Sequence, residues 1–251
     1  MIESLAQTTI KHLIQTIFIT NTFFMKTRLF AFILIFTVLV PQTFAQKRKK
    51  VETGIHFGII GGGGLQTLAG TDYWGEKLKN KFNPGFHVGG NLILSIFDDF
   101  WVQPGIFFAV KGSRQDIITD DITKTVSLGY VEVPLNLLYR PQFGDGHLLI
   151  GAGPYGGYGV LGKERVKSGT ITTELKVKFL SDASSEPTTY VYYRGIDAGA
   201  NIFIGYEFYN NLILQLEGQM GLLKVNSDYG LPNDQTSKKN FGFGLSVGYR
   251  F

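Results

Sequence analysis

The final segment of the chain, residues 240–251, alternates strictly between large apolar side chains and small or polar ones. Successive side chains of a β-strand point to opposite sides, so this pattern predicts a strand with two unlike faces. The apolar face holds Phe241, Phe243, Leu245, Val247, Tyr249 and Phe251. The other face holds glycines, Ser246 and Arg250. Such a strand is typical of an outer-membrane barrel, where lipid covers the apolar face and the polar face lines the interior.

The same alternation recurs along the chain and predicts eight strands in total. Their approximate bounds are 54–65, 85–97, 100–111, 124–140, 147–160, 190–208, 212–223 and 240–251. Upstream of Tyr130 the alternation slips by one position, which predicts a β-bulge. Residues 170–180 also alternate, and we expect them to form a protruding strand beside the ends of the fifth and sixth strands.

The connections between these strands alternate in length. The long, polar ones are 66–83, 112–123, 161–189 and 224–239. Short turns at one end and long loops at the other, with an even strand count, are the arrangement of small bacterial barrels. The sequence therefore predicts an all-β fold: an eight-stranded antiparallel up-and-down transmembrane β-barrel over residues 54–251. It would be integral to the bacterial outer membrane with both termini in the periplasm.

A soluble eight-stranded barrel of the lipocalin type is the main alternative, and it would turn its apolar faces inward around a ligand. Periodicity alone does not separate inside from outside. The charged residues on the alternate face and the terminal Phe251 favour the membrane barrel. So do aromatic residues near the strand ends, which suggest interfacial girdles. These aromatic residues are Trp101, Tyr139, Tyr190, Tyr192, Tyr206, Phe208, Tyr249 and Phe251.

Composition narrows the choice further. The chain has 251 residues, no cysteine and a formal charge of +4. The absence of cysteine excludes disulfides, thiol catalysis and a lipoprotein anchor. The mean hydropathy is near zero, too low for a bundle of membrane helices but usual for a barrel, in which only alternate residues are apolar.

The N-terminal region predicts export. Residues 25–45 combine a basic start, an apolar run at 29–40 and a small-x-small cleavage box, so they read as a signal peptide cut between Ala45 and Gln46. The apolar run is shorter than the roughly 20 residues that a spanning helix needs. Residues 1–24 precede a complete signal peptide and are interpreted as an over-extended start. Residues 46–53 are interpreted as a basic periplasmic tail, not as a nucleic-acid site.

A family resemblance rests on three internal segments and on the C-terminal Gly-Tyr-x-Phe ending. The segments are Tyr130 to Arg140 (YVEVPLNLLYR), Gly151 to Tyr155 (GAGPY) and Gly199 to Glu207 (GANIFIGYE). Together they resemble the PorT-like outer-membrane β-barrel domain family. The resemblance implies a small outer-membrane barrel. It says little of activity, because most members have none assigned, although the eponymous member is implied in the assembly of a secretion machine.

Charged residues on the inward face are the candidate site. They are Lys111, Glu132, Asp197, Glu207, Glu217 and Arg250. Strands that pair in order would bring Lys111 beside Glu132, and Glu217 beside Arg250. An eight-stranded barrel leaves room only for side chains, and buried charges must pair or stay hydrated. We therefore expect an internal ladder of salt bridges, with a gated ion path as the alternative.

No catalytic, cofactor or metal site is predicted. The histidines His56, His87 and His147 are too scattered for a shared zinc site. His87, expected at the outer rim, could be drawn with Asp72 or Ser113 as acid–base groups, but no motif supports this. The glycine run at 61–64 lacks the lysine and hydroxyl residue of a phosphate loop.

The outer loops are where binding would occur. One loop carries Tyr73, Trp74 and several lysines, and another carries Lys163, Arg165, Lys167, Lys176 and Lys178. These cations could bridge lipopolysaccharide phosphates. Expected partners are outer-membrane lipid and lipopolysaccharide, a possible protein at the loops, and the barrel-assembly machinery, which would read the C-terminal signal Tyr249 and Phe251. The sequence predicts a non-enzymatic envelope-structural or surface-binding protein. The alternatives are a narrow pore, an accessory component of a secretion apparatus and a soluble lipocalin-like binder.

Overall fold

A computed structural model describes residues 54–117 and 122–251. These residues belong to one unit, residues 51–251. The expected over-extended start, signal peptide, Ala45–Gln46 cleavage site and basic tail lie outside the described residues, so those expectations stay predictions. No helix within the described ranges is long and apolar enough to cross a membrane.

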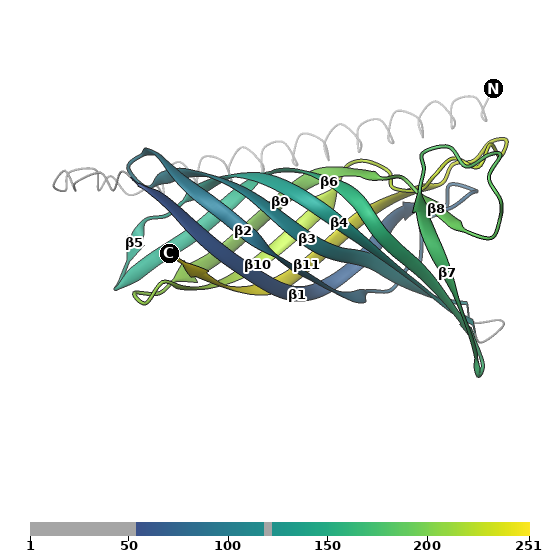
Figure 1. The fold of residues 1–251 in the computed structure, drawn as a ribbon, viewed down its shortest axis with the longest axis horizontal. Helices are drawn as coiled ribbons and strands as arrows, with labels where there is room; N and C mark the ends of the chain where they lie inside the picture. The colour runs from purple at the N-terminus through teal and green to yellow at the C-terminus, as the bar shows by residue number, and fades with distance from the viewer. Residues whose placement is uncertain (1–53, 118–121) are drawn as a thin grey trace, which may run out of the picture. The chain divides into compact units, whose positions relative to one another are not determined.

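The described residues form eleven β-strands (Figure 1). They are β1 (Ile55–Thr71), β2 (Asn83–Phe97), β3 (Phe100–Ile117), β4 (Ile122–Tyr139), β5 (Gln142–Phe143), β6 (Gly146–Ser168), β7 (Ile171–Phe179), β8 (Val191–Tyr193), β9 (Ile196–Glu207), β10 (Leu212–Gly221) and β11 (Ser237–Arg250).

Eight of these strands pair in a closed antiparallel ring. The ring runs β1-β2-β3-β4-β6-β9-β10-β11, and β1 pairs with β11 from Gly58↔Arg250 to Thr71↔Ser237 to close it. Short turns and the C-terminus lie at one end, the turn end, and the long connections lie at the other, the loop end (Figure 1). The predicted all-β eight-stranded barrel is confirmed.

Several strands run further toward the loop end than the alternation predicted. The segments beyond the predicted ends are polar, yet their backbone groups are satisfied by pairing with each other. The β3–β4 ladder continues to Ile117↔Ile122, and the β4–β6 ladder continues to Ile122↔Ser168. The protruding strand expected near 170–180 is β7, which pairs with β6. Part of loop 161–189 is therefore ordered sheet.

A bulge occurs at the predicted position, where the β4–β6 register shifts between Gly129 and Tyr130, but the inward parity of β4 continues unbroken through Val126, Leu128, Tyr130 and Glu132. Tyr130 lies opposite Gly159 and Gly129 lies opposite Leu161, so Val160 on β6 is the extra residue. Val160 and Leu161 are consequently both exposed, at 50% and 55%. The bulge therefore shifts the outward positions of β6 by one residue, from even-numbered residues before it to odd-numbered residues at the loop end.

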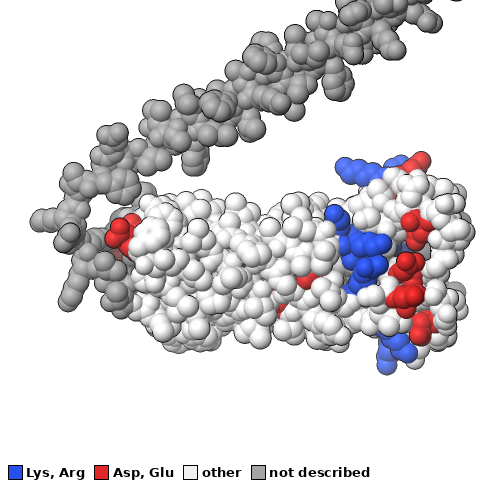
Figure 2. Space-filling model, turned by 90° about the horizontal axis from the view of Figure 1, so that it is seen from above, with Lys and Arg blue, Asp and Glu red and all other residues white. Residues whose placement is uncertain are grey.

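The outer surface of the barrel is apolar and the interior is polar. On β11, Phe243, Leu245 and Val247 are exposed, whereas Ser246 and Arg250 are buried. The face shown in Figure 2 has a broad uncharged band along the barrel, with most of its Lys, Arg, Asp and Glu at the loop end. This is the reverse of the lipocalin arrangement, so the soluble alternative does not fit the structure.

Two of the aromatic residues expected in interfacial girdles are buried instead, Trp101 in the lumen near the turn end and Tyr192 among loop residues, where its hydroxyl donates to the carbonyl oxygen of Pro187. Trp101 and Tyr192 are only 2% and 3% exposed. Trp101 shares the parity of Gln103 and Lys111, and that parity faces inward on β3. Tyr139, Phe208, Tyr249 and Phe251 do face outward at the turn end. Tyr249 and Phe251 contact each other with ring centroids 5.0 Å apart, and their role as an assembly signal stays a prediction.

Candidate functional site

Two clusters of buried apolar side chains, which we call plugs, lie in the barrel, one near each end. The turn-end plug consists of Ile93, Trp101, Leu138, Leu149, Phe203 and Ile213. The loop-end plug consists of Leu68, Val126, Leu128, Tyr130, Val177, Tyr193 and Val225. All of these side chains are buried. The charged residues that the sequence placed inside lie in layers between or beside these plugs.

The first ionic layer, the lysine layer, lies beside the loop-end plug. Lys111 on β3 forms ion pairs with Glu132 on β4 and with Asp197 on β9, the latter at 3.0 Å. The Lys111 ammonium also lies 4.3 Å from the ring centre of Tyr155. Asp197 accepts hydrogen bonds from the Tyr155 hydroxyl at 3.1 Å and from Asn240 at 2.9 Å. One ammonium therefore pairs with two carboxylates in a buried layer.

The structure brings Lys111 to Glu132, as strand order suggested, but Asp197 reaches the same ammonium from across the lumen. Strand β9 is not a neighbour of β3 in the ring. Alternation along a strand predicts that a side chain points inward. It does not predict which residue that side chain contacts on a strand across the lumen.

The second ionic layer, the arginine layer, lies at the turn end. Arg140 donates to both carboxylate oxygens of Glu207, at 2.7 Å and 3.2 Å. Arg250 lies 3.5 Å from Glu207 and donates to Asn91 at 3.0 Å. The guanidinium of Arg140 also lies 5.6 Å from the ring centre of Trp101. Two guanidinium groups therefore share one carboxylate.

The expected pairing of Glu217 with Arg250 is wrong. Strand β10 begins at Leu212 opposite Tyr249, which places Glu217 opposite Gly244. Arg250 lies at the last position of β11 and reaches Glu207 on β9. Arg140 is an interior charge outside the candidate set. The sequence did indicate that Arg140 points inward, because it lies an even number of residues from Glu132 and Asn136, which face inward on β4.

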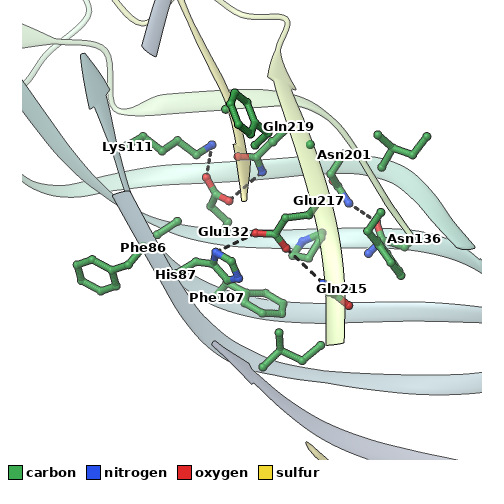
Figure 3. A pocket seen from close by; sticks show the side chains of 18 of the residues that line it. Phe86, His87, Phe107, Lys111, Glu132, Asn136, Asn201, Gln215, Glu217 and Gln219 are labelled. Carbon is green, nitrogen blue, oxygen red and sulfur yellow. Dashed lines mark hydrogen bonds and ion pairs between the residues drawn. The ribbon is translucent and has the colours of Figure 1, made fainter. Parts of the chain in front are cut away.

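Between the two ionic layers lies a polar chamber of about 100 Å³ (Figure 3). Seven side-chain amides line its wall, and they are Gln66, Asn91, Gln103, Asn136, Asn201, Gln215 and Gln219. Asn136 donates to Gln103 at 3.2 Å and accepts from Asn201, and Gln219 donates to Glu132 at 3.1 Å. A space of this size and polarity suits several ordered water molecules.

His87 belongs to this chamber, so the expectation of a rim histidine near Asp72 or Ser113 is wrong. Its Nδ1 lies 3.1 Å from a carboxylate oxygen of Glu217, and its Nε2 lies 3.0 Å from the Ser246 hydroxyl. Asp72 instead accepts from backbone amides of its own loop. His87 faces inward because it shares parity with Asn91, and Gly62 lies opposite it on β1.

The order Ser246–His87–Glu217 resembles that of a hydrolase triad. The Ser246 side chain is fully buried and does not line the chamber. A nucleophile must be accessible to its substrate, and this serine is 0% exposed. We interpret the three residues as a buried hydrogen-bond chain. Within 54–117 and 122–251, no cluster of His, Asp and Glu could hold a metal ion.

The loop end carries two exposed ionic clusters of a different kind. Asp116 lies 2.8 Å from both Lys81 and Arg114, and hydrogen bonds from these cations lower the pKa of Asp116 to about 2. Glu174 on β7 lies 3.0 Å from Arg165 and 3.5 Å from Lys163 on β6. The Arg165 hydrogen bond, with help from Lys163, lowers the pKa of the Glu174 carboxyl.

A closed ring of eight antiparallel strands with a lipid-facing exterior and an ion-paired lumen defines the class of transmembrane β-barrels. Residues 44–227 match the family model of the outer membrane protein beta-barrel domain. This match spans well over half of the chain, so the protein belongs to that family and is integral to the bacterial outer membrane. The narrower PorT-like resemblance stays a prediction. A search of curated proteins finds no match.

Solved structures of outer-membrane barrels are similar to the chain at low identity. Ail, the attachment invasion locus protein of Yersinia pestis, is 15% identical, with 79% of this chain and 100% of that chain covered and a TM-score of 0.37. Neisserial surface protein A is 11% identical, with 79% and 99% covered and a TM-score of 0.41. A major outer membrane protein from Thermus thermophilus is 12% identical, with 79% and 100% covered and a TM-score of 0.42. At these scores the likenesses add nothing on function.

Proposed function

We propose that this protein is a non-conducting, non-enzymatic outer-membrane barrel that binds an extended segment of a partner protein at the cell surface. The turn end and both termini would face the periplasm, and the loop end would face outward. The observation that carries the proposal is the extension of the barrel wall past the bulge. There β3, β4, β6 and β7 continue as a paired sheet, which we call the loop-end sheet (residues 111–117, 122–128, 162–168 and 171–176).

The loop-end sheet has an open edge on β7. Strand β7 pairs with β8 only over Val177–Phe179, and no other described strand pairs with that edge over residues 171–176. The opposite edge, on β3, is partly covered, because Lys81 and Arg114 form an isolated bridge. An uncovered edge is the surface to which an extended peptide adds as a further strand.

The geometry of the β6–β7 hairpin identifies the free backbone groups. Its two loop residues are 169 and 170, and Gly169 has a φ of +56° at the first loop position. In a two-residue hairpin the closing pair, here Ser168 and Ile171, is hydrogen-bonded across the ladder. The amides of residues 172, 174 and 176 therefore point to the open edge, whereas those of 171, 173 and 175 bond to β6.

The two plugs support the non-conducting part of the proposal, because clusters of buried apolar side chains in the lumen oppose the passage of ions. In planar bilayers we expect the purified protein to give no steady unitary conductance at physiological salt. A reproducible unitary current would favour the narrow-pore alternative instead.

The binding part is tested at one edge position. We would place a photo-crosslinking residue at Thr170, at the hairpin tip, in intact cells. Thr172→Pro removes one edge donor without removing a bond to β6, and Thr172→Val keeps the donor and the β-branched shape. We expect a discrete adduct that Thr172→Val retains and Thr172→Pro loses, while both variants keep the heat-modifiable mobility of a folded barrel. An adduct that Thr172→Pro leaves unchanged contradicts edge binding. A component of a secretion apparatus is one class of partner that the adduct could reveal.

A further inference from the structure

We propose that the outward face of the loop-end sheet binds the phosphate groups of lipid A, the lipid moiety of lipopolysaccharide, in the outer leaflet. This inference goes beyond partner binding at the β7 edge, and it shares with the proposed function only the outward orientation of the loop end. It rests on where the cations lie relative to the lipid-facing surface, on their charge balance and on the hydroxyl groups beside them.

The basic face begins where the apolar surface ends. On β6, Tyr158, Val160 and Leu161 are exposed at 60%, 50% and 55%. After the bulge, Lys163, Arg165 and Lys167 take the outward positions of the same strand, and Glu164 faces inward. The same change occurs on β4, where exposed Val131 and Val133 give way to Thr125 and Ser127. Residues two apart are about 7 Å apart along a strand, so this boundary is narrow.

Five cations occupy the outward face of β6 and β7 at this height: Lys163, Arg165, Lys167, Lys176 and Lys178. Lys163 lies directly opposite Lys176 in the β6–β7 ladder. Like charges at directly opposed positions destabilise a strand pair unless something neutralises them. Glu174 is the one carboxylate on this face of the two strands, and it is shared by Arg165 and Lys163.

Among the described residues, the remaining cations thus have too few carboxylates to neutralise them. No ion pair among the described residues includes Lys167 or Lys176, and Lys178 contacts the ring of Tyr190 at 3.8 Å. On the inward face of the same sheet the situation differs, because Lys124 pairs with Glu164 at 2.8 Å. The outward face therefore carries an excess positive charge that an external anion would neutralise.

Hydroxyl groups complete the chemistry of a phosphate site. In the β4–β6 ladder Ser127 lies opposite Lys163, and Thr125 lies opposite Arg165. Both hydroxyl residues face outward, because Val126 and Leu128 between and beside them are buried. A phosphate on this surface would meet ammonium, guanidinium and hydroxyl donors together, and such charge-assisted hydrogen bonds are the strong ones.

The position of the site selects a lipid as the occupant. Acyl chains would lie against Tyr158, Val160 and Leu161, and a phosphate attached to those chains would then be level with Lys163 and Arg165. Free phosphate would gain the cations but not the apolar contact. A bis-phosphorylated glycolipid uses both parts of the surface, and the pair of opposed lysines suits an anion that lies between the two strands.

The test compares two double variants of the full chain in nanodiscs that contain lipid A in both leaflets. Lys163→Gln with Lys176→Gln neutralises the opposed pair. The control, Lys77→Gln with Lys79→Gln, removes the same charge from exposed positions in the loop between β1 and β2. The measurement is the amount of lipid A retained per protein after detergent extraction, determined by mass spectrometry. Folding is checked by heat-modifiable mobility.

We expect the first variant to retain roughly thirtyfold less bis-phosphorylated lipid A, since each cation near a charged surface contributes about a factor of five to six. The control variant should match the parent protein. Dephosphorylated lipid A should be retained no better by the parent than by the variant. Millimolar inorganic phosphate should displace little lipid A from the parent.

Equal retention of bis-phosphorylated lipid A by the two variants would overturn the proposal. The proposal would also fail if the parent protein retained dephosphorylated lipid A as well as it retains bis-phosphorylated lipid A. Efficient displacement by inorganic phosphate would show a site for free anions and overturn the lipid assignment. Orientation is measured separately, by labelling Thr170→Cys in intact cells with a membrane-impermeant maleimide, because the chain contains no cysteine. An unlabelled cysteine would contradict the proposed function and its orientation, while the nanodisc result would still judge the phosphate site.

Discussion

The two ionic layers of the lumen are near mirror images in charge. In the arginine layer two guanidinium groups, Arg140 and Arg250, share the single carboxylate of Glu207. In the lysine layer one ammonium, Lys111, holds the two carboxylates Glu132 and Asp197. All of these residues are at most 6% exposed. The first layer carries an excess positive charge, and the second carries an excess negative charge.

This difference makes the two layers unequal in robustness. An arginine cannot lose its proton, so the arginine layer depends on Glu207 for neutralisation. The lysine layer has a spare carboxylate, and a carboxyl group can also take up a proton when it is left unpaired. Loss of one acid should therefore be severe at the turn end and tolerable beside the loop-end plug.

The largest expected effect comes from removing the shared carboxylate. Glu207→Gln leaves two buried guanidinium groups facing each other, and we expect a loss of about 3–5 kcal/mol in the free energy of unfolding. Asp197→Asn should cost only about 1–2 kcal/mol, because Lys111 keeps Glu132. Urea unfolding in detergent micelles, followed by loss of heat-modifiable mobility, measures both. Equal losses would show that the charge excess of each layer does not control its stability.

The next largest effect distinguishes what the apolar plugs contribute to stability and to blocking ions from what the ionic layers contribute. Leu128→Ala in the loop-end plug removes a fully buried side chain, and we expect a loss of about 3 kcal/mol. Conductance should stay absent, because the turn-end plug still closes the lumen. Planar-bilayer recordings of the variant check this. A steady current from Leu128→Ala would mean that the turn-end plug alone does not block ions.

Much of this arrangement was readable from the sequence, and the failures have a common cause. Alternation placed Lys111, Glu132 and Asp197 inside because parity along a strand is fixed by the backbone. It could not supply the register between strands, so Glu217 was paired with Arg250 when it meets His87. Contacts across the lumen are likewise invisible to it.

The loop end was the least predictable region for a related reason. Residues 161–168 lack the apolar face on which the strand assignment relied, and they remain strand because their backbone groups pair with β4 and β7. Trp101 shows the opposite error. Its aromatic ring and its place near a strand end suggested the membrane interface, although its parity with Gln103 indicated the interior.

A smaller effect tests the packing around the His87–Ser246 contact between the layers. A Cβ at Gly62 would lie 2.3 Å from the Ser246 hydroxyl and 2.5 Å from the carbonyl oxygen of Leu245, so Gly62→Ala should cost about 1–3 kcal/mol. Gly61→Ala is the matched control, because its nearest neighbour lies at 3.7 Å. We expect that control to change the unfolding free energy by less than about 0.5 kcal/mol. Urea unfolding of the two variants decides whether the His87–Ser246 contact is tightly packed.

The smallest effect contrasts the buried layers with the exposed pair at the loop end. The pKa of Asp116 is lowered from 3.8 to about 2 by Lys81 and Arg114. A carboxyl whose pKa is depressed by folding contributes stability above its unfolded pKa, and that contribution is lost as the pH falls through the folded value. The window is therefore pH 4 down to pH 2. Hydrogen exchange of the loop between β1 and β2, corrected for intrinsic rates, should lose protection by less than about fivefold across this window, because exposed pairs are weak.

Asp116→Asn is the control for this titration, since it removes the group and should leave the protection of the same loop independent of pH. The backbone bridge between Lys81 and Arg114, with the Lys81 amide 2.6 Å from the Arg114 carbonyl oxygen, explains why the loop reports on this pair. A loss of protection that persists in Asp116→Asn would assign the acid response to another group. A loss of hydrogen-exchange protection limited to this loop, with the barrel still folded at pH 2, would show that the exposed ion pairs order the loop end. The buried ionic layers would then be what stabilises the strands of the barrel wall.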